Sequence, residues 1–311
     1  MGRVAVVGSL NCDLVMRVGR RPARGETVLA QSFHTFVGGK GGNQAIACAR
    51  AGAEVAMIGR VGDDPFGVAV VQKLTACGVD CRHIGKDAER GTGIADIVVD
   101  DAGDNAICVA PRANEGLAPE HVEAAREPIT HADVVLIQLE IPLEAALVAA
   151  ELGRAAGAVV ILNPAPAPAP SALWSELAAT VDLVVPNQSE VETITGIAAQ
   201  SRDRTVQALR ALRGLGVPTP IVTMGERGVM WLDERDEPRL ATSFPVSVVD
   251  TTAAGDAFCG ALAAALSEKA PIDHAIVSGC AAGALACTKL GAEPSLPSRE
   301  AIECLVASRR S

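Results

Sequence analysis

Residues 250–258 combine a carboxylate with a run of small side chains at a place where a helix is expected to begin. The apolar, β-branched run 244–249 before them predicts a strand, and the Ala/Leu-rich run 257–266 after them predicts a helix. The free N–H groups and the partial positive charge of a helix N-terminus attract anions. A phosphate could approach those N–H groups closely, because the turn is built from Ala253, Ala254 and Gly255.

Asp256 lies in the same turn, and the local sequence supports two interpretations of it. A carboxylate beside an anion site is costly unless it handles a proton or a metal, which would make Asp256 catalytic. Asp is also a preferred N-cap residue, so the side chain could simply cap the helix. The turn alone does not decide between the two.

Residues 38–44 have the most unusual local composition in the chain, with four glycines around Lys40. The glycines would let the backbone approach a ligand, to which Lys40 and Asn43 would donate hydrogen bonds. We expect a binding loop here, opening a helix over residues 45–50 that stops at Gly52. The segment is neither a P-loop, which requires Ser or Thr where Gly41 stands, nor a dinucleotide glycine motif. A merely flexible loop is the weaker interpretation.

From residue 54 onward, predicted strands and helices alternate regularly. The expected strands are 55–59, 134–139, 159–162, 181–185 and 221–223, and the expected helices are 66–77, 143–156, 189–195 and 205–215. This alternation predicts an α/β fold of three layers, with a mainly parallel, doubly wound sheet between helices. Ligands bind such sheets at the carboxyl ends of the strands. Glu140 and residues 187–190, 223–228 and 250–256 all follow predicted strands and should converge there.

The chain before residue 54 and the stretch 93–109 interrupt this alternation. Asn11 and Asp13 follow a first apolar strand, and alternate residues of an extended segment point to the same side. Their side chains could form hydrogen bonds with adjacent hydroxyl groups of a ligand, or they could belong to an ordinary polar turn. The runs 14–18, 27–36, 93–99 and 105–109 predict extra strands, which we expect to form a small sheet or lid beside the main layer.

Composition narrows the class of protein. The 311 residues are 49% hydrophobic and 21% charged, which is typical of a globular chain. A net charge of −10 without a basic run argues against nucleic acid as a partner. Nine cysteines without a CxxC pair indicate free thiols and a cytoplasmic location. No membrane segment is expected, because the longest uncharged stretch, 155–175, is interrupted by Pro164, Pro166, Pro168 and Pro170.

The two glycine-containing motifs, taken together and in this order, resemble the signatures of the ribokinase-type (PfkB) sugar kinases. One motif is residues 38–45, continued by Gly52 and Gly62, and the other is residues 250–261. Further similar stretches are 8–13, 138–142, 162–166 and 291–295, so the resemblance covers nearly the whole chain. Within the family the chain is most similar to the kinases of ribose. The resemblance implies a single ribokinase-like α/β domain over residues 1–311, with lid strands from about 12–36 and 92–110.

The resemblance further implies ATP-dependent phosphorylation of the primary hydroxyl of D-ribose, giving D-ribose 5-phosphate and ADP. By position, Asp256 would be the base, and the backbone N–H groups of Ala253, Ala254, Gly255 and Asp256 would form the anion hole. The sugar would be held by Asn11, Asp13, Gly39, Lys40, Asn43, Glu140 and Asp256. Asn11 would favour a sugar with a 2-hydroxyl over a deoxyribose.

The resemblance also implies sites for ATP, Mg²⁺ and K⁺. ATP would contact Asn187, Glu190, Thr223, Gly225, Gly228, Gly255 and Cys280, with Glu190 arranging Mg²⁺ through water. The K⁺ site would consist of Asp250, Thr252, Ala286, Lys289, Gly291 and Ser295. A homodimer formed through the lid strands is expected as well.

Two other functions remain open on the sequence: a kinase for another sugar or a nucleoside, and a sugar-binding protein that has lost catalysis. Intact Lys40, Gly255 and Asp256 favour an active enzyme. Two positions depart from the family pattern: Arg112 stands where Gly is usual, and Cys280 stands where Asn is frequent.

Overall fold

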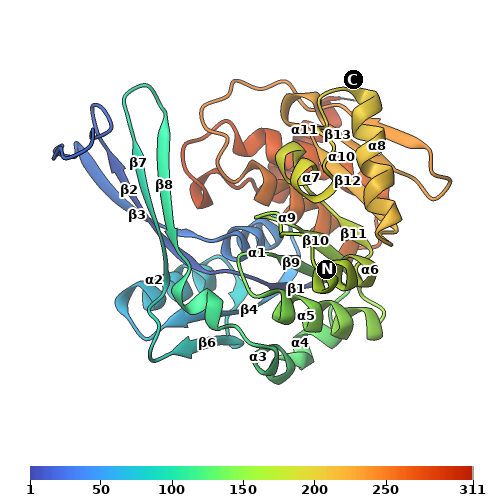
Figure 1. The fold of residues 1–311 in the computed structure, drawn as a ribbon, viewed down its shortest axis with the longest axis horizontal. Helices are drawn as coiled ribbons and strands as arrows, with labels where there is room; N and C mark the ends of the chain where they lie inside the picture. The colour runs from blue at the N-terminus through green and yellow to red at the C-terminus, as the bar shows by residue number, and fades with distance from the viewer. Residues whose placement is uncertain (310–311) are drawn as a thin grey trace.

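A ten-stranded sheet forms the centre of the computed structural model, which describes residues 1–309 (Figure 1). Its strands run in the order β14-β13-β12-β11-β10-β9-β1-β4-β5, with β6 also paired to β4. All pairs are parallel except the antiparallel edge formed by β12, β13 and β14. The strands are β1 Arg3–Val7, β4 Glu54–Gly62, β5 Val79–Asp80, β6 Ile84–Asp87, β9 Val134–Gln138, β10 Val159–Asn163, β11 Leu183–Val184, β12 Thr219–Thr223, β13 Val229–Leu232 and β14 Pro238–Ala241.

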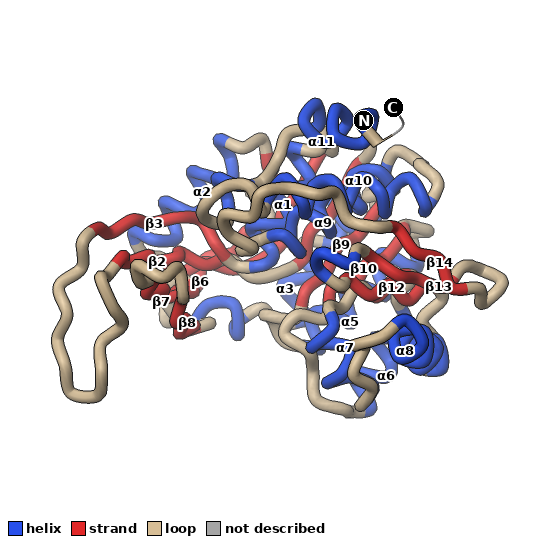
Figure 2. The backbone as a smooth tube through the Cα atoms, turned by 90° about the horizontal axis from the view of Figure 1, so that it is seen from above, coloured by secondary structure: helices blue, strands red, loops and turns tan. Residues whose placement is uncertain are grey.

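Helices cover both faces of this sheet (Figure 2). One face carries α1 Lys40–Arg50, α2 Pro65–Ala76, α9 Ala254–Ser267, α10 Ile272–Ala286 and α11 Arg299–Ser308. The other carries α3 Pro119–Ala124, α4 Arg126–Thr130, α5 Leu143–Ala155, α6 Ala172–Thr180, α7 Gln188–Thr195 and α8 Arg202–Gly214. Along β1, Val4 and Val6 enter one core while Ala5 and Val7 enter the other, as expected of a strand buried on both sides. The predicted three-layer, doubly wound fold is therefore confirmed.

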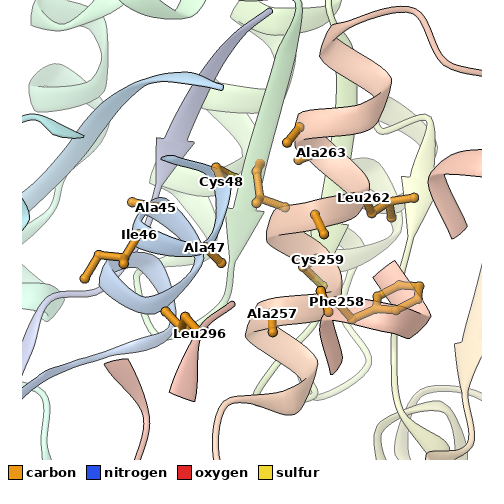
Figure 3. Packing of buried hydrophobic residues seen from close by; sticks show 14 of the residues in the cluster. Ala45, Ile46, Ala47, Cys48, Ala257, Phe258, Cys259, Leu262, Ala263 and Leu296 are labelled. Atoms are coloured by element: carbon orange, nitrogen blue, oxygen red, sulfur yellow. The ribbon is translucent and has the colours of Figure 1, made fainter. Parts of the chain in front are cut away.

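Helices α1 and α9 pack closely, although about two hundred residues separate them in the sequence. Figure 3 shows Ala45, Ile46, Ala47 and Cys48 of α1 beside Ala257, Phe258 and Cys259 of α9. Gly260 permits the close approach, because a Cβ there would lie 2.3 Å from Ala47 Cβ and 2.9 Å from Cys48 N. The packing brings the two signature motifs together.

A separate four-stranded sheet extends from one side of the molecule (Figure 1). Its order is β3-β2-β7-β8, with a parallel central pair and antiparallel outer pairs. The strands are β2 Asn11–Arg17, β3 Ser32–Gly38, β7 Gly93–Val99 and β8 Asn105–Ala110. The expected extra strands thus form one small sheet, although residues 27–31 lie outside any strand.

The strand predicted over 244–249 is wrong. Strand β14 ends at Ala241, and the following segment has no regular secondary structure up to α9. Pro245 has no N–H to donate to a ladder, and the N–H groups of Val249 and Asp250 donate to Cys287 O beyond the end of α10. The segment is therefore held at the C-terminal end of α10 instead of joining the sheet.

Within residues 1–309, no helix has the length and apolar character needed to cross a membrane. The nine cysteines all lie in this range as free thiols, in agreement with the sequence prediction.

Candidate active site

Two adjoining cavities lie beyond the carboxyl ends of the parallel strands, where the ligand site was expected. The smaller, about 180 Å³, is polar and includes Lys40, Asn187, Glu190 and Asp256 in its lining. The larger, about 700 Å³, is mostly apolar and extends over α10. Both cavities are lined by Thr223, Thr251, Ala254 and Gly255, so the start of α9 lies between them.

Asp256 is the third residue of α9 and is 8% exposed. Its Oδ2 accepts a hydrogen bond from Asn43 Nδ2 at 3.1 Å, and its Oδ1 accepts one from Gln44 Nε2 at 2.9 Å. Burial raises the pKa of Asp256, although Lys40, Gln44 and Asn43 act in the opposite direction. The N-cap position belongs to Ala253, whose side chain makes no capping bond, so the interpretation of Asp256 as a cap is wrong. The carboxylate is instead fixed in the site, where it can accept a proton.

The start of α9 has the features of an anion site. Its first helical bond runs from Ala257 N to Ala253 O, so the N–H groups of Ala254, Gly255 and Asp256 precede the helical ladder. Of these, Ala254 N donates to Thr251 O at 3.2 Å. Ala253 has a left-handed φ of 59°, which turns the chain into the helix. A Cβ on Gly255 would meet no heavy atom within 4 Å, so a ligand has room there.

The glycine-rich segment is the first turn of α1, which corrects the expected loop and helix start at residue 45. The helix begins at Lys40 after Gly39, whose φ is 78°. Glycine is required for close packing: a Cβ on Gly41 would lie 2.6 Å from Ser9 O, and one on Gly39 would lie 2.8 Å from Asn11 N. This contact with the backbone of residues 8–11 positions Lys40 and Asn43 beside the start of β2.

Three carboxylates act electrostatically on Lys40, namely Glu140, Glu190 and Asp256. Burial acts to lower the pKa of Lys40, but Asp256, Glu140 and Glu190 outweigh it and raise that pKa. Glu140 Oε2 accepts hydrogen bonds from Ser9 Oγ at 2.5 Å and from Lys40 N at 3.1 Å. A half-buried cation among several acceptors can bind hydroxyl groups and a phosphate together.

Replacing Asp13 with Asn should raise the Tm at pH 8. Burial, followed by Glu140 and Asp256, raises the pKa of Asp13 from 3.8 to about 7. The folded state therefore holds the proton of the Asp13 carboxyl more tightly than the unfolded state does. The stability that this protonated carboxyl contributes is fully present below pH 3.8 and is lost as the pH rises through about 7. The Tm advantage of Asp13→Asn should therefore shrink as the pH falls toward 4, as measured by thermal unfolding in a pH series. An equal advantage at pH 5 and pH 8 would contradict this account, and the exposed Asp273→Asn is the control.

Sequence reasoning missed a set of buried amides behind Asp256. Gln44 Nε2 also donates to Asn163 Oδ1 at 3.0 Å, and Gln44 Oε1 accepts from Gln138 Nε2 at 2.6 Å. Asn163 Nδ2 in turn donates to Val185 O at 2.8 Å. The available signal was that the apolar strands β9 and β10 each end in an amide, Gln138 and Asn163. These amides orient Gln44 and, through it, Asp256.

On the other side of the small cavity, Asn187 and Glu190 cap α7 reciprocally. Asn187 Oδ1 accepts from Glu190 N at 2.9 Å, and Glu190 Oε2 accepts from Asn187 N at 2.8 Å. Burial raises the pKa of Glu190, against the effects of the Asn187 N–H and Lys40. The capping box uses Oε2, so the other carboxylate oxygen can face a hydrated divalent cation, whose preferred ligands are oxygens.

The larger cavity, about 700 Å³, contains five of the residues predicted to contact ATP. The residues predicted to contact ATP here, Thr223, Gly225, Gly228, Gly255 and Cys280, all line it. Phe244, Val246 and Val248, from the segment wrongly predicted as a strand, form an apolar wall. Burial raises the pKa of Cys280 to about 12, so this residue presents a neutral thiol.

The predicted cation ligands are only partly brought together. Asp250 Oδ1 accepts from Thr252 N at 2.9 Å and from Thr252 Oγ1 at 2.7 Å, while Oδ2 accepts from Gly291 N at 2.8 Å. These bonds outweigh the effect of burial and lower the pKa of Asp250. The remaining predicted ligands have local contacts: Lys289 N donates to Ala286 O, and Ser295 Oγ donates to Ala292 O. Carboxylate and backbone oxygens suit a hard cation.

Arg112, one of the two departures from the family pattern, has a left-handed φ of 47°, the region that favours glycine. Its Nη1 donates to Thr92 O at 3.0 Å, and the next residue, Ala113, donates its N–H to Gly91 O. The side chain thus ties the short helix η1, Arg112–Gly116, to the start of β7.

The family described as pfkB family carbohydrate kinase matches residues 1–299. The chain belongs to this family. It is 37% identical over 297 residues to a ribokinase of Haemophilus influenzae, covering 96% of each chain. It is 35% identical over 297 residues to a deoxyribokinase of Salmonella typhi, again covering 96% of each chain. Among solved structures, Arabidopsis thaliana ribokinase complexed with ribose and ATP matches with a TM-score of 0.91 and 31% identity, covering 98% of both chains.

Proposed function

We propose that this family member transfers the γ-phosphoryl group of ATP to the primary hydroxyl of D-ribose, giving D-ribose 5-phosphate and ADP. The observation that carries the proposal is the position of Asp256, a buried carboxylate at the start of α9 between the two cavities. The small cavity accepts the transferring phosphate, and the sugar binds next to it, on the side of Lys40 and Asp256. The larger cavity accepts the rest of the nucleotide.

In the reaction, the sugar oxygen forms a bond to phosphorus while the bond from phosphorus to the ADP oxygen breaks. The hydroxyl proton passes to Asp256, and because a carboxylate is a weak base for an alcohol, this transfer becomes favourable only late. The N–H groups of Gly255 and Asp256 stabilise the charge that develops on the phosphoryl oxygens. Asn11, Asp13, Lys40, Asn43 and Glu140 hold the acceptor for in-line attack.

Mg²⁺, when bound, would neutralise phosphate charge. Glu190, with Asn187 fixing its carboxylate, is the residue placed to hold the water shell of this ion. The four-stranded sheet would act as a lid that excludes water from the site and so suppresses ATP hydrolysis.

The acceptor is best tested with an ATP-coupled assay over ribose, 2-deoxyribose, other pentoses, hexoses and nucleosides. We expect the highest kcat/KM with D-ribose. The similarity to a deoxyribokinase makes 2-deoxyribose the informative competitor. A higher kcat/KM with 2-deoxyribose, or with a nucleoside, would overturn ribose as the acceptor while leaving the kinase chemistry in place.

A K⁺ ion near Asp250 would support the anion hole from behind the turn. Exchanging K⁺ for Na⁺ should then lower kcat about fivefold or more, which a difference of about 1 kcal/mol in transition-state stabilisation would produce. The Asp250→Ala variant should respond equally to both ions. Equal rates of the unaltered enzyme in K⁺ and Na⁺ would refute this site.

A homodimer through the lid is the proposed assembly. Strand β8 is exposed along its whole length, and Phe33, Ile107 and Val109 are each more than half exposed. Unpaired strand edges and apolar side chains favour pairing with a second copy. Sedimentation should give the mass of a dimer for the unaltered protein and of a monomer for Ile107→Lys. A monomeric unaltered protein would contradict the assembly.

A cytoplasmic location is also proposed, because it agrees with the free thiols.

A further inference from the structure

Asn114 lies in η1, is 1% exposed and makes three hydrogen bonds to the chain just before and at the start of β2. Its Oδ1 accepts from Leu10 N at 2.8 Å, and its Nδ2 donates to Leu10 O at 3.3 Å and to Asn11 Oδ1 at 2.8 Å. Because a backbone N–H can only donate, the bond from Leu10 N places the oxygen of Asn114 toward it. The nitrogen of Asn114 must therefore face Asn11.

This arrangement fixes the orientation of the Asn11 amide as well. The oxygen of Asn11 accepts the hydrogen bond from Asn114. The amide nitrogen of Asn11, with its two hydrogens, is therefore the group that can donate to a ligand. Gly93 leaves room for the pair, since a Cβ there would lie 2.1 Å from Asn11 Oδ1 and 2.5 Å from Asn114 Nδ2.

The orientation matters because of Asp13. Asn11 and Asp13 are two residues apart on β2, so their side chains lie on the same side of the strand. An ionised Asp13 only accepts hydrogen bonds, and a sugar hydroxyl has a single proton to donate. A hydroxyl between them is satisfied when it donates to Asp13 and accepts from Asn11 Nδ2. If Asn11 presented its oxygen instead, two acceptors would compete for one proton.

We propose that Asn114 is a positioning residue that makes Asn11 a hydrogen-bond donor to a sugar hydroxyl, and that it thereby sets the preference for ribose over 2-deoxyribose. The inference rests on the proposed function, because it requires a sugar bound against Asn11 and Asp13. A site built to bond a hydroxyl discriminates against the analogue that lacks it, since the site's buried polar group is then left unpaired. Asn114 itself touches no substrate in this account.

The Asn114→Asp variant tests the inference, because it keeps an acceptor for Leu10 N and replaces the Nδ2 donor that faces Asn11, at the cost of the longer bond to Leu10 O. At pH 8, we expect the Kd for ribose to rise about tenfold, as the loss of one hydrogen bond would produce, and the Kd for 2-deoxyribose to change less than about threefold. The KM for ATP and the kcat at saturating ribose should stay within about twofold of the unaltered values. Asn114→Ser, whose shorter side chain cannot reach both partners, is a second variant with the same expected selectivity.

A double-mutant cycle separates this role from general stability. In the Asn11→Ala background, Asn114→Asp should no longer change the ratio of the two Kd values. An equal weakening of ribose and 2-deoxyribose binding, or a persistent change of the ratio without Asn11, would overturn the inference. If the unaltered protein binds neither sugar, the proposed function has failed instead.

Discussion

Replacing Asp256 with Asn should lower kcat by about 10³-fold or more while ribose binding remains measurable. General base catalysis contributes about 10² to 10⁴ in rate, and the amide cannot take the hydroxyl proton. Asn is nearly the same size and still accepts one of the bonds from Asn43 and Gln44, so the fold around it should persist. Single-turnover kinetics with ATP and calorimetric titration with ribose would measure the two effects separately.

Asp273→Asn is a matched control for this experiment. Asp273 also lies in the first turn of a helix, α10, but its side chain is exposed and away from both cavities. Its replacement should leave kcat within about twofold of the unaltered value. If Asp256→Asn retains a kcat within tenfold of the unaltered enzyme, Asp256 is not the base.

Gly255→Ala should fold normally and yet lose about 10²-fold in kcat/KM for ATP. The added Cβ meets no protein atom within 4 Å, and Ala has a higher helix propensity than Gly, so the Tm should stay the same or rise slightly. The methyl group would instead occupy space that a phosphate needs to reach the N–H groups at the start of α9. Losing one oxyanion donor typically costs about 10² to 10³ in rate.

Gly214→Ala provides the comparison, because a Cβ at this last residue of α8 also meets nothing within 4 Å. It should change neither the Tm nor the kinetics appreciably. Full activity of Gly255→Ala would show that no phosphate approaches this turn. A lower Tm would show that the added methyl group collides with protein atoms.

The spacing of apolar residues along the chain predicted the main sheet and most of its helices. Strands buried on both sides are continuous apolar runs, and amphipathic helices repeat their apolar residues every three or four positions. The start of α1 was missed because glycine has a low helix propensity. The helix forms there because Gly41 packs on the backbone of Ser9, a contact that no local pattern contains. Residues 244–249 have strand-forming side chains, but Pro245 lacks an N–H group and the N–H of Val249 donates to Cys287 O just past the end of α10.

The candidate site divides in the same way. Asp256, Lys40 and Asn43 lie in motifs whose composition is unusual, so they could be selected from the sequence. Gln44 and Asn114 could not be assigned roles, because their roles depend on partners 212 and 103 residues away along the chain. The cap interpretation of Asp256 failed for a related reason: its two hydrogen-bond partners come from α1 and not from its own helix.

The most direct test of the central claim is NMR of the product formed from uniformly ¹³C-labelled D-ribose and ATP. If Asp256 activates the primary hydroxyl, the C5 signal should show coupling to phosphorus, and one ADP should appear for each sugar phosphorylated. Phosphorylation at another carbon, or release of ADP without any phosphorylated sugar, would contradict the account.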